Sequence, residues 1–333
     1  MKPIPLTRCV FLMPFNELLA DIGTPTTSLL AKFHLPTSLE EKVDQYVPLL
    51  PAIRFTVAAQ TSQGIADIGF RAAQRLQFEH LSEQLKKTVS HSPTLFTALQ
   101  QVCTFASFED TILRVWLEPG EHSVRVCSIL AGTAGIPNLE NSQWIQNLMI
   151  IHIVRQFTGP DWAPATIAFE ARYTPSVETQ SLWPNTRFLS AQKSSWIDVP
   201  VSQLALPNPA RGALLNRPGS EFRRNGTDPV TALKLMLSSY LDERLPSIAE
   251  VAEIAGTSIR SLQRELASVG LTYSSLLDQV RFEKAADLLL NTGDKIIDVA
   301  FATGYADPAY FARAFRRMAG VTPREFREHS QAR

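Results

Sequence analysis

Two segments in the C-terminal third of the chain repeat one pattern, and this repeat limits the folds open to that part. The first copy runs from residue 248 to 272 and the second from 296 to 322. Self-similarity of this kind is typical of one supersecondary unit that is used twice. The copies share a valine, an alanine and a glycine in the same order: Val251, Ala252 and Gly256 in the first, and Val299, Ala300 and Gly304 in the second.

Each shared residue type has a physical role in a pair of helices joined by a tight turn. The alanine lets two helices cross at close range. The glycine ends the first helix in a left-handed backbone conformation that other residues adopt only with strain. Ser258 and Asp307 follow as capping residues that begin a second helix. We therefore expect two helix-turn-helix units, whose second helices each have an apolar face and a polar face able to enter a DNA major groove.

A helical array whose hairpins pack only on each other is the alternative interpretation of this pattern. One copy of the alanine, glycine and capping-residue spacing would not distinguish the two possibilities. Two copies joined by one long helix favour the DNA-binding arrangement.

Helix-start signals mark the whole C-terminal part of the chain. Asp228-Pro229 and Asp307-Pro308 each place a capping carboxylate before a proline at the first helical position. Two capping boxes run from Ser247 to Glu250 and from Thr322 to Glu325. Together with apolar periodicity, these signals predict helices at residues 229–242, 247–255, 258–268, 273–291, 295–303, 308–318 and 323–329.

A linker is expected before these helices. Residues 205–229 contain four prolines and three glycines, which interrupt every periodic pattern. This composition is typical of a connection between domains. The expected division is an N-terminal domain at residues 1–206, a linker at 207–228 and a helical domain at 229–333.

The N-terminal part mixes the helical period with the strand period. Its patterns predict a helix at 92–103, a β-hairpin from 111 to 130 around Pro119-Gly120, a helix at 140–157 and a strand at 165–173. Residues 1–60 are broken by prolines and carry no assignable pattern. The expected fold class is an α+β N-terminal domain joined to an all-α C-terminal domain of two helix-turn-helix units linked by a long helix.

The charge of the chain is neutral. The 32 basic residues balance the 32 acidic residues, and residues 221–333 hold 15 of each. The strong basic excess that points directly to nucleic acid is therefore missing. Residues 308–317 nevertheless contain three arginines and no acid. The local distribution of charged residues determines the electrostatic potential that acts on DNA phosphates. A DNA-binding role is therefore compatible with a net charge of zero.

Cysteine and histidine usage gives little support to other site chemistries. The three cysteines, Cys9, Cys103 and Cys127, form no CxxC pair or disulfide framework, which favours a reducing cytoplasm. The six histidines have no metal-ligand spacing, and no nucleotide-binding or nucleophile-elbow motif occurs. No signal peptide or apolar run of membrane-spanning length is present. We expect no catalytic residue, no metal, no cofactor and a cytoplasmic location.

With these elements in place, residues 229–329 resemble the DNA-binding domain of the AraC/XylS family of bacterial transcription regulators. The matching elements are the run Ser261 to Arg264, the long-helix residues Arg281, Ala285, Leu288 and Leu289, and the runs Val299 to Tyr305, Phe311 to Phe315 and Gly320 to Arg327. The resemblance implies a sequence-specific regulator of transcription that binds double-stranded operator or promoter DNA, associated with the bacterial nucleoid. It also implies a homodimer, a contact with RNA polymerase and a role as activator, although the residues do not separate activation from repression.

The N-terminal half resembles the effector-binding domain of an AraC-type subgroup that includes ornithine-responsive regulators. The resemblance rests on the helix start at residues 92–95, on the hairpin after it and on residues 171–175. It implies a sensor domain at 1–206 that binds a small-molecule effector and brings two chains together. The effector and the residues that bind it stay unassigned.

Four DNA contacts are expected on the second helix of the first unit: Arg260, Ser261, Gln263 and Arg264. Arginine pairs with guanine and glutamine with adenine in the major groove. The family resemblance implies base contacts at Arg260, Gln263 and Arg264. A purely structural or phosphate-binding role is the alternative for Arg264.

Five further contacts are expected on the second helix of the second unit: Ala309, Tyr310, Arg313, Arg316 and Arg317. The Ala309 side chain donates no hydrogen bond, so base reading there is expected to depend on Arg313. Arg316 and Arg317 are expected to hold phosphates, with a solvated basic turn as the alternative. The second unit is therefore expected to read less sequence than the first.

Two other functions stay open at this point. One is a regulator without a ligand, governed by its abundance or by a protein partner. The other is an enzyme fused to the same DNA-binding module, such as a methyl-accepting DNA-repair regulator, which needs an activated cysteine with a base close by. Cys103 and Cys127 fall in predicted core elements and Cys9 in an apolar run, which disfavours the enzyme.

Overall fold

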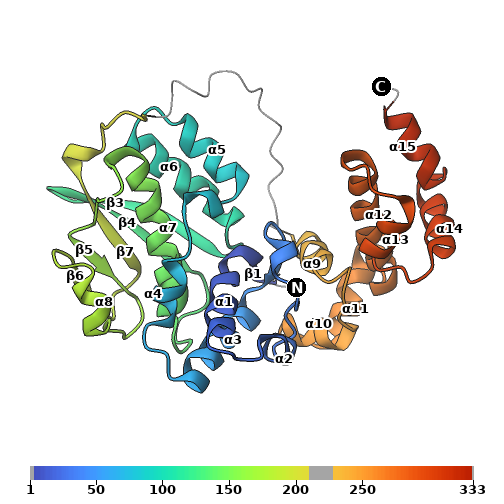
Figure 1. The fold of residues 1–333 in the computed structure, drawn as a ribbon, viewed down its shortest axis with the longest axis horizontal. Helices are drawn as coiled ribbons and strands as arrows, with labels where there is room; N and C mark the ends of the chain where they lie inside the picture. Colours follow the sequence, from blue (N-terminus) through green and yellow to red (C-terminus); the bar gives the residue numbers. More distant parts are fainter. Residues whose placement is uncertain (1–3, 210–227, 332–333) are drawn as a thin grey trace.

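The computed structural model describes residues 4–209 and 228–331 of the chain. Figure 1 shows an α+β part, coloured from blue to yellow, beside a helical part coloured orange and red. This arrangement confirms the expected fold class. Most of the expected linker, residues 210–227, lies outside the described residues.

Five strands form the main sheet of the described α+β part. Their order across the sheet is β3-β4-β7-β5-β6, and only β5 and β6 run parallel. The predicted hairpin is confirmed, since β3 pairs with β4 from Leu113 opposite Leu130 to Pro119 opposite Val124. The strand expected at 165–173 is shorter than expected, because the chain leaves the ladder after Ala168. The strands are β3 Leu113–Pro119, β4 Ser123–Leu130, β5 Thr166–Ala168, β6 Arg187–Leu189 and β7 Ser195–Pro200.

One helix, α7 (Glu140–Thr158), fills the middle of this part and confirms the helix expected at 140–157. It is buried on nearly every side, as a helix that neighbouring elements cover on all faces must be. Trp144 near its start is fully buried and lies against Phe70 and Phe169, with ring centroids 4.7 and 5.0 Å away. The surrounding helices are α3 Leu49–Gln63, α4 Ile68–Ala73, α5 Glu83–His91, α6 Leu95–Phe105 and α8 Val177–Ser181.

Residues 4–60, in the region that the sequence left unassigned, wrap the side of this core that faces the helical part (Figure 1). Two short strands, β1 (Leu6–Arg8) and β2 (Tyr46–Pro48), pair antiparallel. Between them lie α1 (Met13–Asp21) and α2 (Thr26–Lys32). Strands this short show no alternation that a sequence pattern can detect. Single 3₁₀ turns complete the α+β part at Cys9–Phe11, Glu40–Lys42, Phe78–His80, Ala106–Phe108 and Val201–Gln203.

Within residues 228–331 the chain is helical, and the helices expected there are confirmed with bounds shifted by a few residues. The expected caps are in place: the Ser247 hydroxyl accepts from the Glu250 backbone amide at 3.3 Å, and Asp307 accepts from the Ala309 amide at 2.8 Å. The helices are α9 Pro229–Ser238, α10 Ile248–Ile254, α11 Ile259–Ser268, α12 Tyr273–Asn291, α13 Ile296–Ala302, α14 Pro308–Ala319 and α15 Pro323–Gln331.

The β1–β2 pair joins the two parts through a shared apolar core. Leu6 of β1 is fully buried in the same cluster as Leu233 and Met236 of α9. Tyr46 of β2 belongs to that cluster, whereas its neighbour Val47 belongs to the core of the α+β part. Successive side chains of a strand point to opposite sides. The pair therefore contributes side chains to both cores at once.

A polar contact fixes the same junction just after α9. The Glu243 carboxylate accepts from the Thr37 backbone amide and hydroxyl, both at 2.8 Å, and from the Ser38 amide at 3.0 Å. It also forms an ion pair with Lys42, whose side chain is 1% exposed. Asp242 lies 3.1 Å from the same ammonium group. These directed bonds specify one docked orientation, which apolar packing alone does not.

The first prediction concerns the Glu243 carboxylate. Burial raises the pKa of Glu243, but hydrogen bonds from Lys42, Thr37 and Ser38 outweigh it and lower the pKa to about 2. Because the folded pKa lies below the unfolded value, this stabilisation is complete above about pH 5 and disappears as the pH falls towards 2. Glu243→Gln should cost on the order of 1–3 kcal/mol at neutral pH. It should also split the thermal unfolding of the chain into two transitions in calorimetry.

Glu283→Gln is the matched control for this prediction. Glu283 pairs with Lys234 at 2.6 Å, but its side chain is 58% exposed. An exposed pair of this kind contributes about 0–1 kcal/mol. A single unchanged transition in Glu243→Gln, or an equal effect of the two variants, would contradict the role given to Glu243.

The second prediction compares the two turn glycines. Gly256 has a φ of +61° and open space where a Cβ would lie, whereas Gly304 has a φ of +76° and a Cβ there would lie 2.3 Å from the Leu241 carbonyl oxygen. Gly256→Ala should therefore cost about 1–2 kcal/mol from backbone strain alone. Gly304→Ala should cost a further ~1–3 kcal/mol because the second turn must move off the end of the α9 segment. Equal losses in urea denaturation of the two variants would exclude this close approach.

Candidate nucleic-acid interface

The first unit places α11 behind a sharp turn. Gly256 follows α10 in the left-handed conformation, and the Ser258 hydroxyl accepts from the Ser261 backbone amide at 3.1 Å. Leu262 and Leu266 are buried in the core that contains α9 and α10. A helix held by one apolar face must present the opposite face to solvent.

Three of the expected DNA contacts lie on that opposite face. Arg260, Gln263 and Arg264 are exposed, and their side chains form no hydrogen bond or ion pair within residues 4–209 and 228–331. Their donors are therefore free to reach base edges or phosphates. Ser261 differs, because it is half-buried and its hydroxyl accepts a hydrogen bond from Ser258 at 2.9 Å. Its own hydroxyl hydrogen stays available for a contact near the start of the helix.

The second unit repeats this construction with more aromatic packing. The Asp307 carboxylate and Pro308 start α14, and Phe311 and Phe315 bury its inner face against Tyr305 and Phe326. Four of the expected contacts on the outer face are charged or aromatic, and the fifth is the methyl group of Ala309. All five are exposed: Ala309, Tyr310, Arg313, Arg316 and Arg317.

Two of these arginines already have partners within the protein. The Arg317 guanidinium donates to Asp278 of α12 at 3.2 Å. The Arg313 guanidinium lies 5.8 Å from the centre of the Tyr310 ring, a cation–π distance. Arg316 has no hydrogen-bonded or ionic partner among the described residues. The sequence pattern did not separate Arg316 from Arg317. The structure distinguishes them, because only Arg317 pairs with the Asp278 carboxylate of α12.

Arg281 is a residue of this domain that the sequence analysis named only as part of the family resemblance. It lies on α12, with its guanidinium 5.0 Å from the centre of the Tyr305 ring. Its buried Nε has no hydrogen-bond partner in the described part of the chain. Beside it, Gly304 approaches the Leu241 backbone so closely that no side chain fits between them. These contacts place the turn of the second unit against α12 and against the segment that follows α9.

The described residues offer little to other kinds of site. They contain no group of three histidine, cysteine or acidic side chains that could hold a metal ion. Within the same residues, no helix has the length and apolar character needed to cross a membrane.

Comparison with known proteins matches both parts of the chain. Residues 251–329 match the family model of a helix-turn-helix domain. Residues 23–183 match the model described as the arabinose-binding domain of AraC transcription regulator, at its N-terminus. The two models cover the two parts seen in Figure 1.

The chain is also similar to individual proteins. The HTH-type transcriptional regulator VirS of Mycobacterium tuberculosis is 22% identical over 97% of both chains. The HTH-type transcriptional regulator VqsM of Pseudomonas aeruginosa is 32% identical over 37% of this chain and 39% of its own. Among solved structures, the transcriptional regulator CdpR from Pseudomonas aeruginosa has a TM-score of 0.39, at 18% identity over 95% of this chain and 97% of its own. Because the model of the AraC N-terminal domain and a helix-turn-helix model match its two parts, the chain belongs to the AraC family of DNA-binding transcription regulators.

Proposed function

We propose that this regulator recognises a specific operator sequence mainly through α11 and that an effector bound to its N-terminal part controls this recognition. The observation that carries the proposal is the exposed face of α11. Among the described residues, Arg260, Gln263 and Arg264 lie there with unpaired side chains, opposite the buried Leu262 and Leu266. Guanidinium and amide groups are the side chains that pair in bidentate fashion with guanine and adenine.

The two units divide the work unequally in this proposal. In α14, the Ala309 methyl group makes at most an apolar contact, and the ion pair with Asp278 restrains Arg317. Arg313, stacked on Tyr310, is the base-reading group of this helix, and Arg316 contacts phosphate. Phosphate contacts position a protein on DNA but carry no sequence information themselves.

The low positive charge of the C-terminal domain also indicates that the protein binds DNA as a homodimer. Its net charge is neutral, so non-specific affinity for DNA is low and one copy of the domain holds DNA weakly. Two copies joined in a homodimer bind adjacent half-sites and restore affinity through effective concentration. In this proposal residues 1–206, the expected N-terminal domain, carry out both dimerisation and effector binding. Acting on operator or promoter DNA, the protein works in the bacterial cytoplasm beside RNA polymerase.

The enzymatic alternative is disfavoured by the state of the cysteines. Burial raises the pKa of Cys9 and of Cys127 to about 12, and that of Cys103 to about 11. A methyl-accepting cysteine needs the opposite shift, because the thiolate is the nucleophile. Covalent modification of any of these thiols by alkylated DNA would favour the enzyme again.

The third prediction tests base reading. Gln263→Ala and Arg264→Ala should each weaken binding to the operator by about 1–3 kcal/mol, or roughly 5- to 150-fold. Each variant should also relax the preference at one base pair, because the lost side chain contacts one base edge. Genomic fragments selected by the purified protein supply the operator, and titration against operator and scrambled DNA measures the loss.

Arg316→Ala is the control for this prediction. A phosphate contact should weaken binding to both DNAs equally and reduce the slope of log affinity against log salt by about one. If Gln263→Ala or Arg264→Ala produced this same uniform loss, these residues would be phosphate contacts and the assignment of base reading to α11 would fail.

A further inference from the structure

Two small cavities adjoin each other inside the N-terminal part, next to β1. One has a volume of about 40 Å³ and the other about 30 Å³. Phe11, Asp110 and Ile145 line both of them. A space of this size on one side of a polar group holds a few non-hydrogen atoms, either as water or as part of a ligand.

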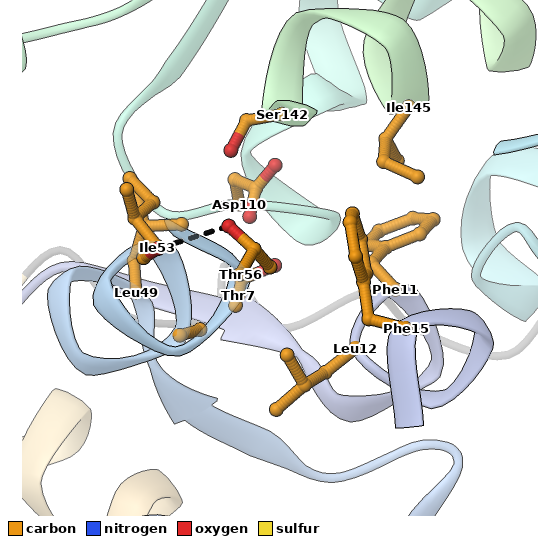
Figure 2. Close-up of a pocket in the computed structure, with 11 residues that line it drawn as sticks. Thr7, Phe11, Leu12, Phe15, Leu49, Ile53, Thr56, Asp110, Ser142 and Ile145 are labelled. Atoms are coloured by element: carbon orange, nitrogen blue, oxygen red, sulfur yellow. Dashed lines mark hydrogen bonds between the residues drawn. The ribbon is translucent and has the colours of Figure 1, made fainter. Parts of the chain in front are cut away.

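Asp110 is the polar group that the two cavities share. It is 7% exposed, and its Oδ1 has no hydrogen-bond partner among the described residues. Figure 2 shows its carboxyl group between Thr56 of α3 and Ser142 of α7, with Phe11 and Phe15 on the other side of the cavity. A buried oxygen without a partner costs free energy, so its presence in a cavity indicates a missing donor.

A second unsatisfied group faces the neighbouring cavity. The side-chain oxygen of Gln146 accepts from Ser128 at 3.2 Å, whereas its Nε2 is buried and has no partner in the described part of the chain. The other walls of this cavity are largely apolar and include Val102, Met149 and Ile153. The two cavities therefore share a polar wall at Asp110, and the second cavity is mostly apolar towards Met149.

The buried charges around Asp110 do not balance. Arg8 forms an ion pair with Glu109 at 3.0 Å, and both side chains are 4% exposed. Asp110 adds a second buried carboxyl group beside this pair. The Asp44 carboxylate, which also binds Arg8 at 2.7 Å, is 81% exposed and hydrated. One positive charge is thus missing from the buried set, and either a proton or a cationic ligand supplies it.

We propose that Asp110 and the two cavities beside it form a binding site for a small primary amine, whose ammonium group pairs with the Asp110 carboxylate and whose short alkyl chain lies against Phe11, Ile145 and Met149. The hydroxyl groups of Thr56 and Ser142 are the neutral acceptors available to the remaining ammonium hydrogens. The inference rests on the proposed effector control, since it gives that effector a place and a chemical class.

The site lies where a ligand would affect the DNA-binding part. Asp110 forms a β-bridge with Thr7 of β1. The adjacent residue of β1, Leu6, is fully buried in the core of the DNA-binding part. A ligand that pulls on Asp110 therefore acts directly beside the junction between sensor and DNA-binding helices.

The pH dependence of amine binding follows from the groups around Asp110. Burial raises the pKa of Asp110 to about 7, with smaller effects from Thr7, Glu109 and Arg8. These are the charged and polar groups that act on it, and the polar groups that α3 and α7 bring to the two cavities, Thr56, Ser142 and Gln146, are neutral. An ammonium ion needs the deprotonated carboxylate, so affinity should rise about tenfold between about pH 6 and pH 8.

The test uses the full chain and three four-carbon probes at millimolar concentration: n-butylamine, n-butanol and butyrate. Thermal shift and calorimetric titration should show binding of the amine, weaker binding of the alcohol and none of butyrate. Asp110→Asn should abolish amine binding and its pH dependence while keeping the fold, because it removes a buried charge without changing shape. Asp44→Asn, in the same ion-pair group but outside the cavities, should leave amine binding unchanged.

Three results would overturn the site. They are equal binding of amine and butyrate, amine binding that survives Asp110→Asn, or no stabilisation by any probe, which would mean that the cavities hold only water. Titration of operator DNA with and without n-butylamine distinguishes failure of the amine site from failure of the proposed effector control. Amine binding that requires Asp110 but leaves operator affinity unchanged would keep the site and reject its role as the effector site.

Discussion

The strand β1 is the element on which the rest of the structure depends, because its residues contact both parts of the molecule. Leu6 lies in the core of the DNA-binding helices, while Thr7 pairs with Asp110 inside the α+β part. Arg8, the last residue of the strand, is held by Glu109, Asp44 and the His80 carbonyl. The strand therefore cannot shift towards one part without disturbing contacts in the other.

The structure explains how the DNA-binding part can be neutral overall and still present unpaired arginines. Several acidic residues are occupied in holding the protein together: Glu243 fixes the junction, Asp278 binds Arg317, and Glu250 closes a capping box. Arg260, Arg264 and Arg316 are left without such partners among the described residues. Unpaired positive side chains therefore gather on the exposed faces of α11 and α14, although the sum of charges over the domain is zero.

A structural feature was predictable from the sequence where the residues that form it lie close together in the chain. The C-terminal helices were predictable because capping residues such as Ser247 and Asp307 act on backbone amides that follow almost directly in the chain. The exposed face of α11 followed from the same helical period. The role of Arg317 was not predictable, because its partner Asp278 lies on a different helix. The secondary structure before residue 61 was not predictable for the same reason, since β1 and β2 are stable only through pairing between distant segments.

The site at Asp110 shows why an unsatisfied polar group is more informative than a motif. No spacing in the sequence singles out Asp110, Gln146 or Ser142, which come from a loop and from α7. They acquire meaning only when burial removes water and leaves Asp110 and Gln146 with unpaired atoms among the described residues.

The response to a ligand should be switch-like. A ligand changes a protein only through different affinity for two states. Because Leu6 is fully buried among α9 side chains, β1 has no continuous range of positions, and packed cores pass between discrete arrangements. The bonds of Glu243 to Thr37 and Ser38 exist only in the docked arrangement, so undocking breaks them together with the apolar contact. In the effector control proposed above, a ligand at Asp110 therefore selects between docked and released states of the whole DNA-binding part, rather than adjusting the angle of one helix.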